Sequence, residues 1–342
     1  MRPPIQIRVF AALFVSWLLL AGCSSPDVQI EGVKGRTMGT TYSLLWPANQ
    51  DVDAQRVREK VELALASINA EMSTYDPSSQ LSQFNKQSSP SSLSIGSDFY
   101  QVMVLSKSVF EQTDGYFDPT VGPLVNLWGF GPDKHPINIP SASTIADTKM
   151  NTGFSAIQLD EGVIRKNAPR YVDLSAVAKG FAVDKVALIL DDFGISSYLV
   201  EIGGELKGKG LKAPGLPWKV AVEKPIEEER AVQEVLPLTN GAMATSGDYR
   251  NYFVLEGKKL SHSIDPFTGY PVEHTLASVT VVDDNCARAD ALATAMLVMG
   301  AEKAKKLAKE EQIAALLIER VGTDFITHKT PAWTGRFEDV ER

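Results

Sequence analysis

The amino-terminal segment limits how the rest of this chain can be stabilised, because it assigns one of only two cysteines to a processing site. Arg2 and Arg8 precede an apolar run that ends at Leu20-Ala21-Gly22-Cys23. A charged start, an apolar stretch shorter than a bilayer span and small residues before a cysteine are typical of a bacterial lipoprotein signal peptide, and they favour cleavage over an uncleaved anchor helix. We therefore expect a signal peptide at 1–22, a tether at 23–29 lipidated on Cys23, and one folded domain at 30–342.

The folded domain must then be stabilised by packing without a disulfide. Cys286 is the other cysteine, and a lipidated Cys23 leaves it no partner within the chain. Two cysteines are too few for a thiolate-ligated iron–sulfur cluster or a structural zinc, and the four histidines, at 135, 262, 274 and 328, show no metal-ligand spacing. Removal of Arg2 and Arg8 leaves 32 basic and 42 acidic residues, a net charge of −10. This charge does not predict nucleic-acid binding.

Hydrophobic periodicity predicts helices and strands that do not alternate strictly. The expected helices lie at about 51–72, capped by Asp51 or Asp53, and at 98–113, 175–193 and 287–309, the last continuing past Gly300. The segment 117–132 is rich in Gly and Pro and is expected to be an ordered loop. Strands are expected within 28–46, on both sides of 161–162, and at 198–202, 219–222, 232–238, 252–255, 276–282, 313–318 and 325–327. This order predicts an α+β fold of two interleaved α/β lobes with mixed, mainly antiparallel sheets, and not a doubly wound parallel sheet.

Several familiar enzyme signatures are absent from the sequence. The glycines at 203, 204, 208 and 210 do not form G-x-G-x-x-G, and no phosphate-binding G-x-x-x-x-G-K-S/T loop occurs. There is also no G-x-S-x-G nucleophile elbow and no H-E-x-x-H helix. Any nucleotide must therefore be held in another way, and hydrolases of these two kinds are disfavoured.

One candidate site lies on the alanine-rich helix that begins near residue 287. Asp290 and Thr294 are four residues apart and so share one helix face. A carboxylate and a hydroxyl suit Mg²⁺, which prefers oxygen ligands and retains water and substrate phosphate in its shell. The structural alternative is that Asp290 only favours the helix start through the macrodipole, and the pair alone favours this alternative.

Two further segments combine polar residues with a helix start or a turn. Asp173 and Ser175 precede Lys179, and backbone amides at such a helix start attract phosphate. The structural alternative makes Asp173 or Ser175 an N-cap and Lys179 a solvated charge. His262 lies just before an Asp-Pro-x-x-Gly turn at 265–269 and could accept a proton from an attacking hydroxyl, although a lone histidine is more often structural.

Taken together and in order, these segments resemble the ApbE family, the FAD:protein FMN transferases. The resemblance covers nearly all of the chain that follows Cys23. Each block alone is weakly specific, whereas the ordered set is very specific. The matching blocks are 38–42 (MGTTY), 72–75 (MSTY), 117–125 (FDPTVGPLV), 172–175 (VDLS), 178–180 (AKG), 201–205 (EIGGE), 245–249 (TSGDY), 262–266 (HSIDP) and 289–294 (ADALAT). Ser263 is the one departure noticed within them, since an apolar residue is expected there.

The resemblance implies a role for each matching position. It implies an FAD cleft between the two lobes, Mg²⁺ on Asp290, Thr294 and the backbone oxygen of Ala176, and His262 as the base. The residues that it implies as FAD contacts are Met38, Tyr75, Tyr116, Phe117, Asp118, Asp173, Lys179 and Ile264.

The resemblance also implies a reaction and a location. A Thr or Ser hydroxyl of an acceptor protein attacks the FMN phosphorus of FAD, AMP leaves, and Mg²⁺ neutralises the pyrophosphate. Acceptors in the family are envelope redox proteins, such as subunits of sodium-pumping NADH:quinone reductase and related complexes. We expect a periplasm-facing lipoprotein on the inner or the outer membrane, with no transmembrane span in the mature chain.

Two alternatives stay open: a metal-dependent FAD pyrophosphatase, in which water replaces the acceptor hydroxyl, and a flavin-binding lipoprotein without turnover.

Overall fold

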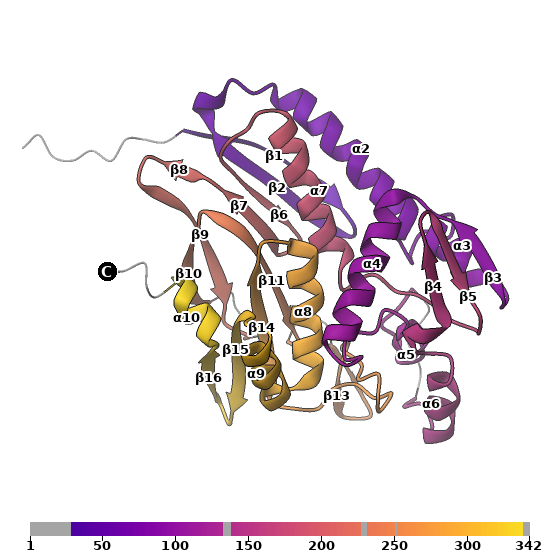
Figure 1. Ribbon diagram of the computed structural model, residues 1–342. Helices are drawn as coiled ribbons and strands as arrows, with labels where there is room; N and C mark the ends of the chain where they lie inside the picture. Colours follow the sequence, from indigo (N-terminus) through magenta and orange to yellow (C-terminus); the bar gives the residue numbers. More distant parts are fainter. Residues whose placement is uncertain (1–28, 133–137, 227–230, 250–251, 338–342) are drawn as a thin grey trace, which may run out of the picture.

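The computed structural model describes residues 29–132, 138–226, 231–249 and 252–337, and its framework is an eight-stranded antiparallel sheet (Figure 1). The proposed signal peptide and most of the tether, Cys23 included, lie outside the described residues. The α+β class with antiparallel sheets is confirmed. In spatial order the strands are β1 (Ile30–Thr37), β2 (Thr40–Pro47), β6 (Tyr198–Ile202), β7 (Glu205–Lys209), β11 (Asn240–Gly247), β14 (Leu276–Asp283), β15 (Ala314–Val321) and β16 (Asp324–Lys329).

Helices cover one face of this sheet and enclose the main core. In the first helix the buried side chains recur at helical spacing, at Val57, Val61, Leu65, Ile68 and Met72. Asp53 caps that helix by accepting a hydrogen bond from the Arg56 amide at 3.0 Å, as expected. The helices are α2 (Ala54–Met72), α4 (Ser97–Gln112), α7 (Ala178–Asp192), α8 (Cys286–Met299) and α9 (Ala301–Glu310).

The helix expected to continue past Gly300 is in fact two helices. Gly300 has φ 75°, outside the α-helical region, and therefore ends α8 and begins α9. The sequence pattern did not reveal this break because apolar and alanine residues continue on both sides of it.

The opposite face of the sheet is covered by a smaller β layer and the last helix. The strands β9 (Leu216–Glu223) and β10 (Val232–Leu238) pair with each other, and β8 (Leu211–Ala213) continues this three-stranded sheet. Their buried side chains pack with the outer residues of β11, β14 and β15 and with Trp333 of α10 (Pro331–Phe337). The eight-stranded sheet is therefore the middle of three layers.

Short elements form a rim at one end of the molecule. The segment 117–132, expected to be a loop, contains α5 (Gly122–Leu127), which Pro123 initiates near its first position. The other rim elements are α3 (Gln80–Lys86), β3 (Ser91–Ser94), α6 (Ala142–Lys149), η2 (Phe154–Ala156), β4 (Ile157–Asp160), β5 (Val163–Lys166), β12 (Tyr252–Leu255) and β13 (Lys258–Ser261). The short helix η1 (Ala48–Gln50) lies elsewhere, where the Ala48 amide donates a hydrogen bond to the Gln29 carbonyl before β1. Among the described residues, no helix is both long and apolar enough to cross a membrane.

Helices α7 and α8 pack closely against each other in the core. A Cβ atom added at Gly180 would lie 2.4 Å from the Cys286 carbonyl oxygen and 2.7 Å from the Cα of Ala287. Cys286, Ala287, Ala291 and most of their α8 neighbours are fully buried. Small residues on both helices therefore let the two backbones approach closely, and this contact positions the residues of the site.

We expect Gly180→Ala to lower the free energy of unfolding by about 1–3 kcal/mol, because the added methyl group overlaps the α8 backbone. Denaturant unfolding followed by circular dichroism measures the change. Gly335→Ala is the matched control: Gly335 lies exposed in α10 with no atom near its added Cβ, so alanine there should raise the free energy of unfolding by about 0.5–1 kcal/mol. Equal effects of the two substitutions would contradict the close packing of α7 on α8.

Candidate active site

A large cavity lies between one end of several strands of the eight-stranded sheet, among them the central strand β11, and the rim elements. Its volume is about 1630 Å³, above the roughly 300–1000 Å³ that is usual for a small-molecule site. It is therefore large enough for an extended ligand together with part of a second substrate. All twelve residues of the folded domain that the sequence singled out line it: Met38, Tyr75, Tyr116, Phe117, Asp118, Asp173, Ala176, Lys179, His262, Ile264, Asp290 and Thr294.

A buried charged cluster forms one wall of the cavity. The Lys179 ammonium lies 2.7 Å from Glu205 Oε1, and the Asp290 carboxylate is close enough to both to affect their pKa values. Asp290 and Glu205 are each only 3% exposed. Burial alone would lower the pKa of Lys179, but the charges of Asp290 and Glu205 raise it above its usual value. Lys179 is therefore ion-paired to a buried carboxylate, with its side chain 30% exposed, and is not the freely solvated charge of the structural alternative.

Glu205 is a site residue to which the sequence analysis assigned no role. Burial raises the pKa of its carboxyl to about 7, although the Lys179 charge opposes this shift. Its second oxygen, Oε2, is buried and has no hydrogen-bond partner among the described residues. A buried acceptor without a partner is costly, so this oxygen is suited to a cation or a donor from a ligand. The sequence feature that could have indicated Glu205 is its position directly after Gly203-Gly204, within one of the blocks that carry the family resemblance.

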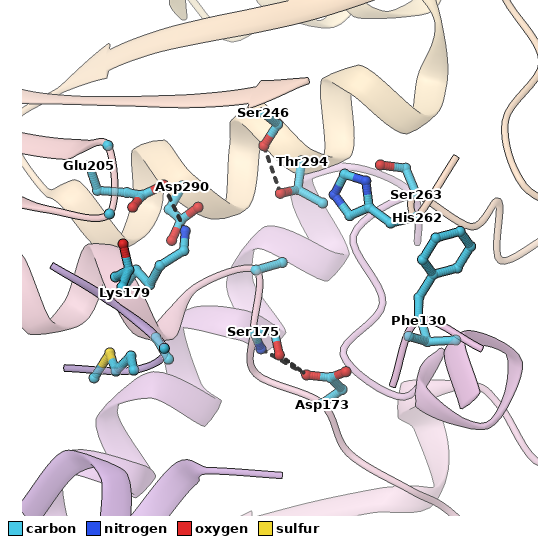
Figure 2. Close-up of a pocket in the computed structure, with 18 of the residues that line it drawn as sticks. Phe130, Asp173, Ser175, Lys179, Glu205, Ser246, His262, Ser263, Asp290 and Thr294 are labelled. Atoms are coloured by element: carbon cyan, nitrogen blue, oxygen red, sulfur yellow. Dashed lines mark hydrogen bonds and ion pairs between the residues drawn. The ribbon is translucent and has the colours of Figure 1, made fainter. Parts of the chain in front are cut away.

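Asp290 and Thr294 lie on the α8 face that borders the cavity, as the helical spacing predicted (Figure 2). Asp290 Oδ2 accepts a hydrogen bond from the Gly180 amide at 3.1 Å, and Thr294 Oγ1 lies 3.0 Å from Ser246 Oγ. Burial raises the pKa of Asp290, whereas the Lys179 charge and the Gly180 amide lower it.

These oxygen atoms are compatible with a hard cation. Within the part of the chain that the structure describes, no group of three or more His, Cys, Asp or Glu side chains could hold a metal. An ion at Asp290 would therefore need hydroxyl, backbone and ligand oxygens, which Mg²⁺ accepts. Thr294 and the Ala176 segment border the same cavity, and Glu205 adds a second carboxylate nearby.

The segment before α7 does not have the N-cap arrangement that the structural alternative predicted for Asp173 or Ser175. The helix begins at Ala178 after Val177 at the N-cap position, so neither Asp173 nor Ser175 caps it. Asp173 Oδ1 instead accepts hydrogen bonds from the Ser175 amide at 2.8 Å and the Ser175 hydroxyl at 2.6 Å. This Asx turn leads the chain along the cavity wall before the helix starts. The N-cap interpretation of both residues is therefore wrong.

The β1–β2 turn places Met38 at the cavity. Met38 and Gly39 both have positive φ, 48° and 72°, as a two-residue hairpin turn of type I′ requires. This conformation is unfavourable for methionine, and residues held in it concentrate at functional sites.

Two aromatic residues, Tyr75 and Tyr116, flank the opening of the cavity. Tyr75 is 66% exposed, and partial burial together with the charge of Asp173 raises its pKa. The Tyr116 ring packs on Phe267 with a centroid distance of 4.7 Å, and its hydroxyl accepts a hydrogen bond from Lys303. Exposed and partly packed rings of this kind provide surfaces on which a planar ligand can stack.

Asp118 has structural partners of its own within the cavity wall. Its Oδ1 accepts hydrogen bonds from the Thr120 amide and hydroxyl at 2.7 and 2.6 Å, and Phe117 beside it is buried. Burial raises the pKa of Asp118, and the two hydrogen bonds from Thr120 oppose this shift.

His262 and Ile264 follow β13 on the far side of the cavity. Ile264 is buried and forms an isolated bridge with Pro271, and Asp265 closes the expected turn by accepting the Phe267 amide at 2.7 Å. The His262 ring lies edge-on to Phe130, 6.3 Å between centroids, and points toward Thr294 (Figure 2). The structure thus brings His262 to the same cavity as Asp290 and Thr294, which lie on a different element.

Comparison with known proteins identifies relatives over nearly the whole chain. The ApbE family model matches residues 38–317. An FAD:protein FMN transferase of Vibrio cholerae is 40% identical over 321 residues, which are 93% of this chain and 96% of that protein. The Haemophilus influenzae protein of the same name is 41% identical over 333 residues, with coverage of 95% and 96%.

Solved structures agree with the sequence comparison. The flavin transferase ApbE from Vibrio cholerae superimposes with a TM-score of 0.83 at 38% identity and covers 90% of this chain and 99% of its own. The apo form of the flavinyl transferase ApbE from Pseudomonas stutzeri gives 0.84 at 36% identity, with coverage of 91% and 97%. The sequence blocks, the fold and these relatives together show that the chain belongs to the ApbE family and is an enzyme of the FAD:protein FMN transferase type.

Proposed function

We propose that this enzyme moves FMN from FAD to a Thr or Ser hydroxyl of an acceptor protein in an Mg²⁺-dependent reaction that releases AMP. The observation that carries the proposal is the convergence of Asp290, Thr294, Lys179 and His262 on one cavity. In the proposed step the acceptor oxygen forms a bond to the FMN phosphorus, and the phosphorus–oxygen bond to AMP breaks. Bound Mg²⁺ would neutralise the pyrophosphate charge.

Residues of this chain would perform the other tasks. The Lys179 ammonium, held by Glu205 at 2.7 Å, would supply positive charge to the phosphates. His262 would take the proton from the incoming hydroxyl, since histidine titrates near neutrality. Asp290, Thr294 and the Ala176 backbone oxygen would hold the metal. Met38, Tyr75, the segment 116–118, Asp173 and Ile264 would contact FAD.

The acceptor and the location are part of the same proposal. A lipid on Cys23 would hold the enzyme at a membrane facing the periplasm, beside envelope redox complexes that need covalent flavin. Subunits of sodium-pumping NADH:quinone reductase or a related complex would be the acceptors. The family relatives named above support flavin transfer to protein, and the lipoprotein signal at residues 1–23 supports the location.

The function is tested by incubating the folded domain with FAD, Mg²⁺ and a peptide that carries an Asp-x-x-Ser/Thr-Gly/Ala-Ala-Ser/Thr segment, followed by mass spectrometry. We expect the peptide to gain the mass of FMN, minus one water, and AMP to appear in equal amount. A peptide with alanine in place of both candidate hydroxyl residues is the control. Free FMN and AMP with an unmodified peptide would indicate the pyrophosphatase instead, and intact FAD would indicate a binding protein.

We expect His262→Ala to lower the rate of peptide modification by about 10²–10⁴-fold, because that is the usual contribution of a positioned general base. FAD affinity, followed by flavin fluorescence, should change little. His328→Ala is the matched control, since His328 lies in β16 and pairs with Glu319 at 3.1 Å, away from the residues that line the cavity. Unchanged modification by His262→Ala would remove His262 from the reaction.

We expect Cys23→Ser to move the full-length protein from the membrane fraction to the soluble fraction, because serine cannot carry the thioether-linked lipid. Cell fractionation and immunoblotting measure this distribution, and Cys286→Ser serves as the control because Cys286 is buried. Continued membrane retention of the Cys23→Ser protein would indicate an uncleaved anchor helix.

A further inference from the structure

A second cavity lies where the first described strand begins, and nothing in the flavin reaction uses it. Its volume is about 520 Å³, and its walls are almost entirely apolar. One wall consists of Ile30, Leu45 and Leu199 on adjacent strands of the main sheet, and Leu216, Pro217 and Trp218 of the β8–β9 hairpin form the other. Because side chains alternate along a strand, Leu44 and Val200 face the helix-covered core, while Leu45 and Leu199 face this groove.

The tip of the β8–β9 hairpin exposes apolar and basic side chains together. Leu211, at the start of β8, is 41% exposed, and Leu216, directly after the turn, is 44% exposed. Lys212 and Lys219 are exposed and border the same groove. Within the described residues, neither lysine side chain forms a hydrogen bond or an ion pair. Local positive charge beside exposed leucines contrasts with the acidic balance of the whole chain.

The position of this hairpin relative to the proposed lipid is the second observation. Ile30 lies seven residues after Cys23, so their Cα atoms are at most about 25 Å apart even in a fully extended chain. Ile30 itself lines the groove, and Figure 1 shows the start of β1 beside the β8 hairpin. A lipid on Cys23 would therefore bring this end of the molecule, and not the α6 end, close to the bilayer.

We infer that the anchor-side hairpin, residues 211–219, together with the start of β1, rests on the surface of a bilayer that contains anionic phospholipid. Leu211 and Leu216 would enter the headgroup region, and Lys212 and Lys219 would contact lipid phosphates. This inference rests on the proposed lipidation of Cys23. Such a contact would add to the membrane affinity that the lipid provides and would fix the orientation of the domain.

The contact would also orient the active site. On β6, a strand of the main sheet, the groove residue Leu199 is followed two positions later by Glu201, which lines the flavin cavity. The groove and the flavin cavity are therefore neighbours along one face of the main sheet. An enzyme resting on the hairpin would hold its flavin cavity at a fixed height above the membrane, within reach of an acceptor segment close to the membrane surface.

The inference is tested on the mature chain starting at Cys23, coupled through the Cys23 thiol to a maleimide lipid in phosphatidylcholine–phosphatidylglycerol vesicles that also contain a photoactivatable lipid. Cys286 is buried and should not react. Mass spectrometry then locates the lipid crosslinks. We expect crosslinks on 211–219 to exceed those on the exposed helix α6 by roughly tenfold, and to decline when phosphatidylglycerol is omitted.

Charge variants test whether the hairpin lysines themselves contribute to the membrane contact, beyond the tethering through Cys23. Lys212→Gln with Lys219→Gln should reduce the hairpin crosslinks by at least about threefold, because each lysine near an anionic surface contributes to binding. Lys60→Gln with Lys309→Gln removes the same charge from exposed sites in α2 and α9 and should have no effect. Crosslinks spread evenly over the surface, or equal effects of the two double variants, would overturn the inference. Because the lipid is attached chemically, these results are independent of native lipidation, which the fractionation of Cys23→Ser tests separately.

Discussion

The close contact between α7 and α8 at Gly180 determines the geometry of the site. It lets the Gly180 amide donate to Asp290 Oδ2 at 3.1 Å, and it places Lys179 beside the same carboxylate. A buried carboxylate without such partners would cost several kcal/mol, because charge is poorly solvated away from water. The packing of α7 on α8 thus stabilises the buried Asp290 carboxylate at the cavity wall. This carboxylate and the Lys179 ammonium beside it make the wall suitable for a metal and phosphates.

The rest of the cavity is built on turns whose conformations the fold maintains. The type I′ turn at Met38, the Asx turn at Asp173 and the turn at Asp265 come from different parts of the chain, and each places residues in the wall of the same cavity. The wide cavity between them leaves room for FAD and for part of an acceptor protein, which a narrow nucleotide cleft would not.

The sequence predicted the parts of this structure that depend on regular periodicity. Helix α2 and its Asp53 cap are confirmed, as are the shared face of Asp290 and Thr294 and the strands on both sides of residues 161–162. It failed where backbone conformation or small residues decide the outcome. Strand β11 was not expected because Gly241, Ala242 and Ala244 give no β-pattern, and the break at Gly300 depends on a single φ angle. The role of Glu205 follows from burial next to Lys179, which no spacing along the chain encodes.

The most direct test of the account is the dependence of FAD affinity on Mg²⁺, measured by calorimetry on the wild-type enzyme and on Asp290→Asn. If the Asp290 wall holds the metal against the FAD pyrophosphate, Mg²⁺ should tighten FAD binding to the wild-type enzyme by at least about tenfold, a coupling of roughly 1.4 kcal/mol. Asp290→Asn should lose this coupling while binding metal-free FAD normally. Equal coupling in both proteins would contradict the assignment of the metal to this wall.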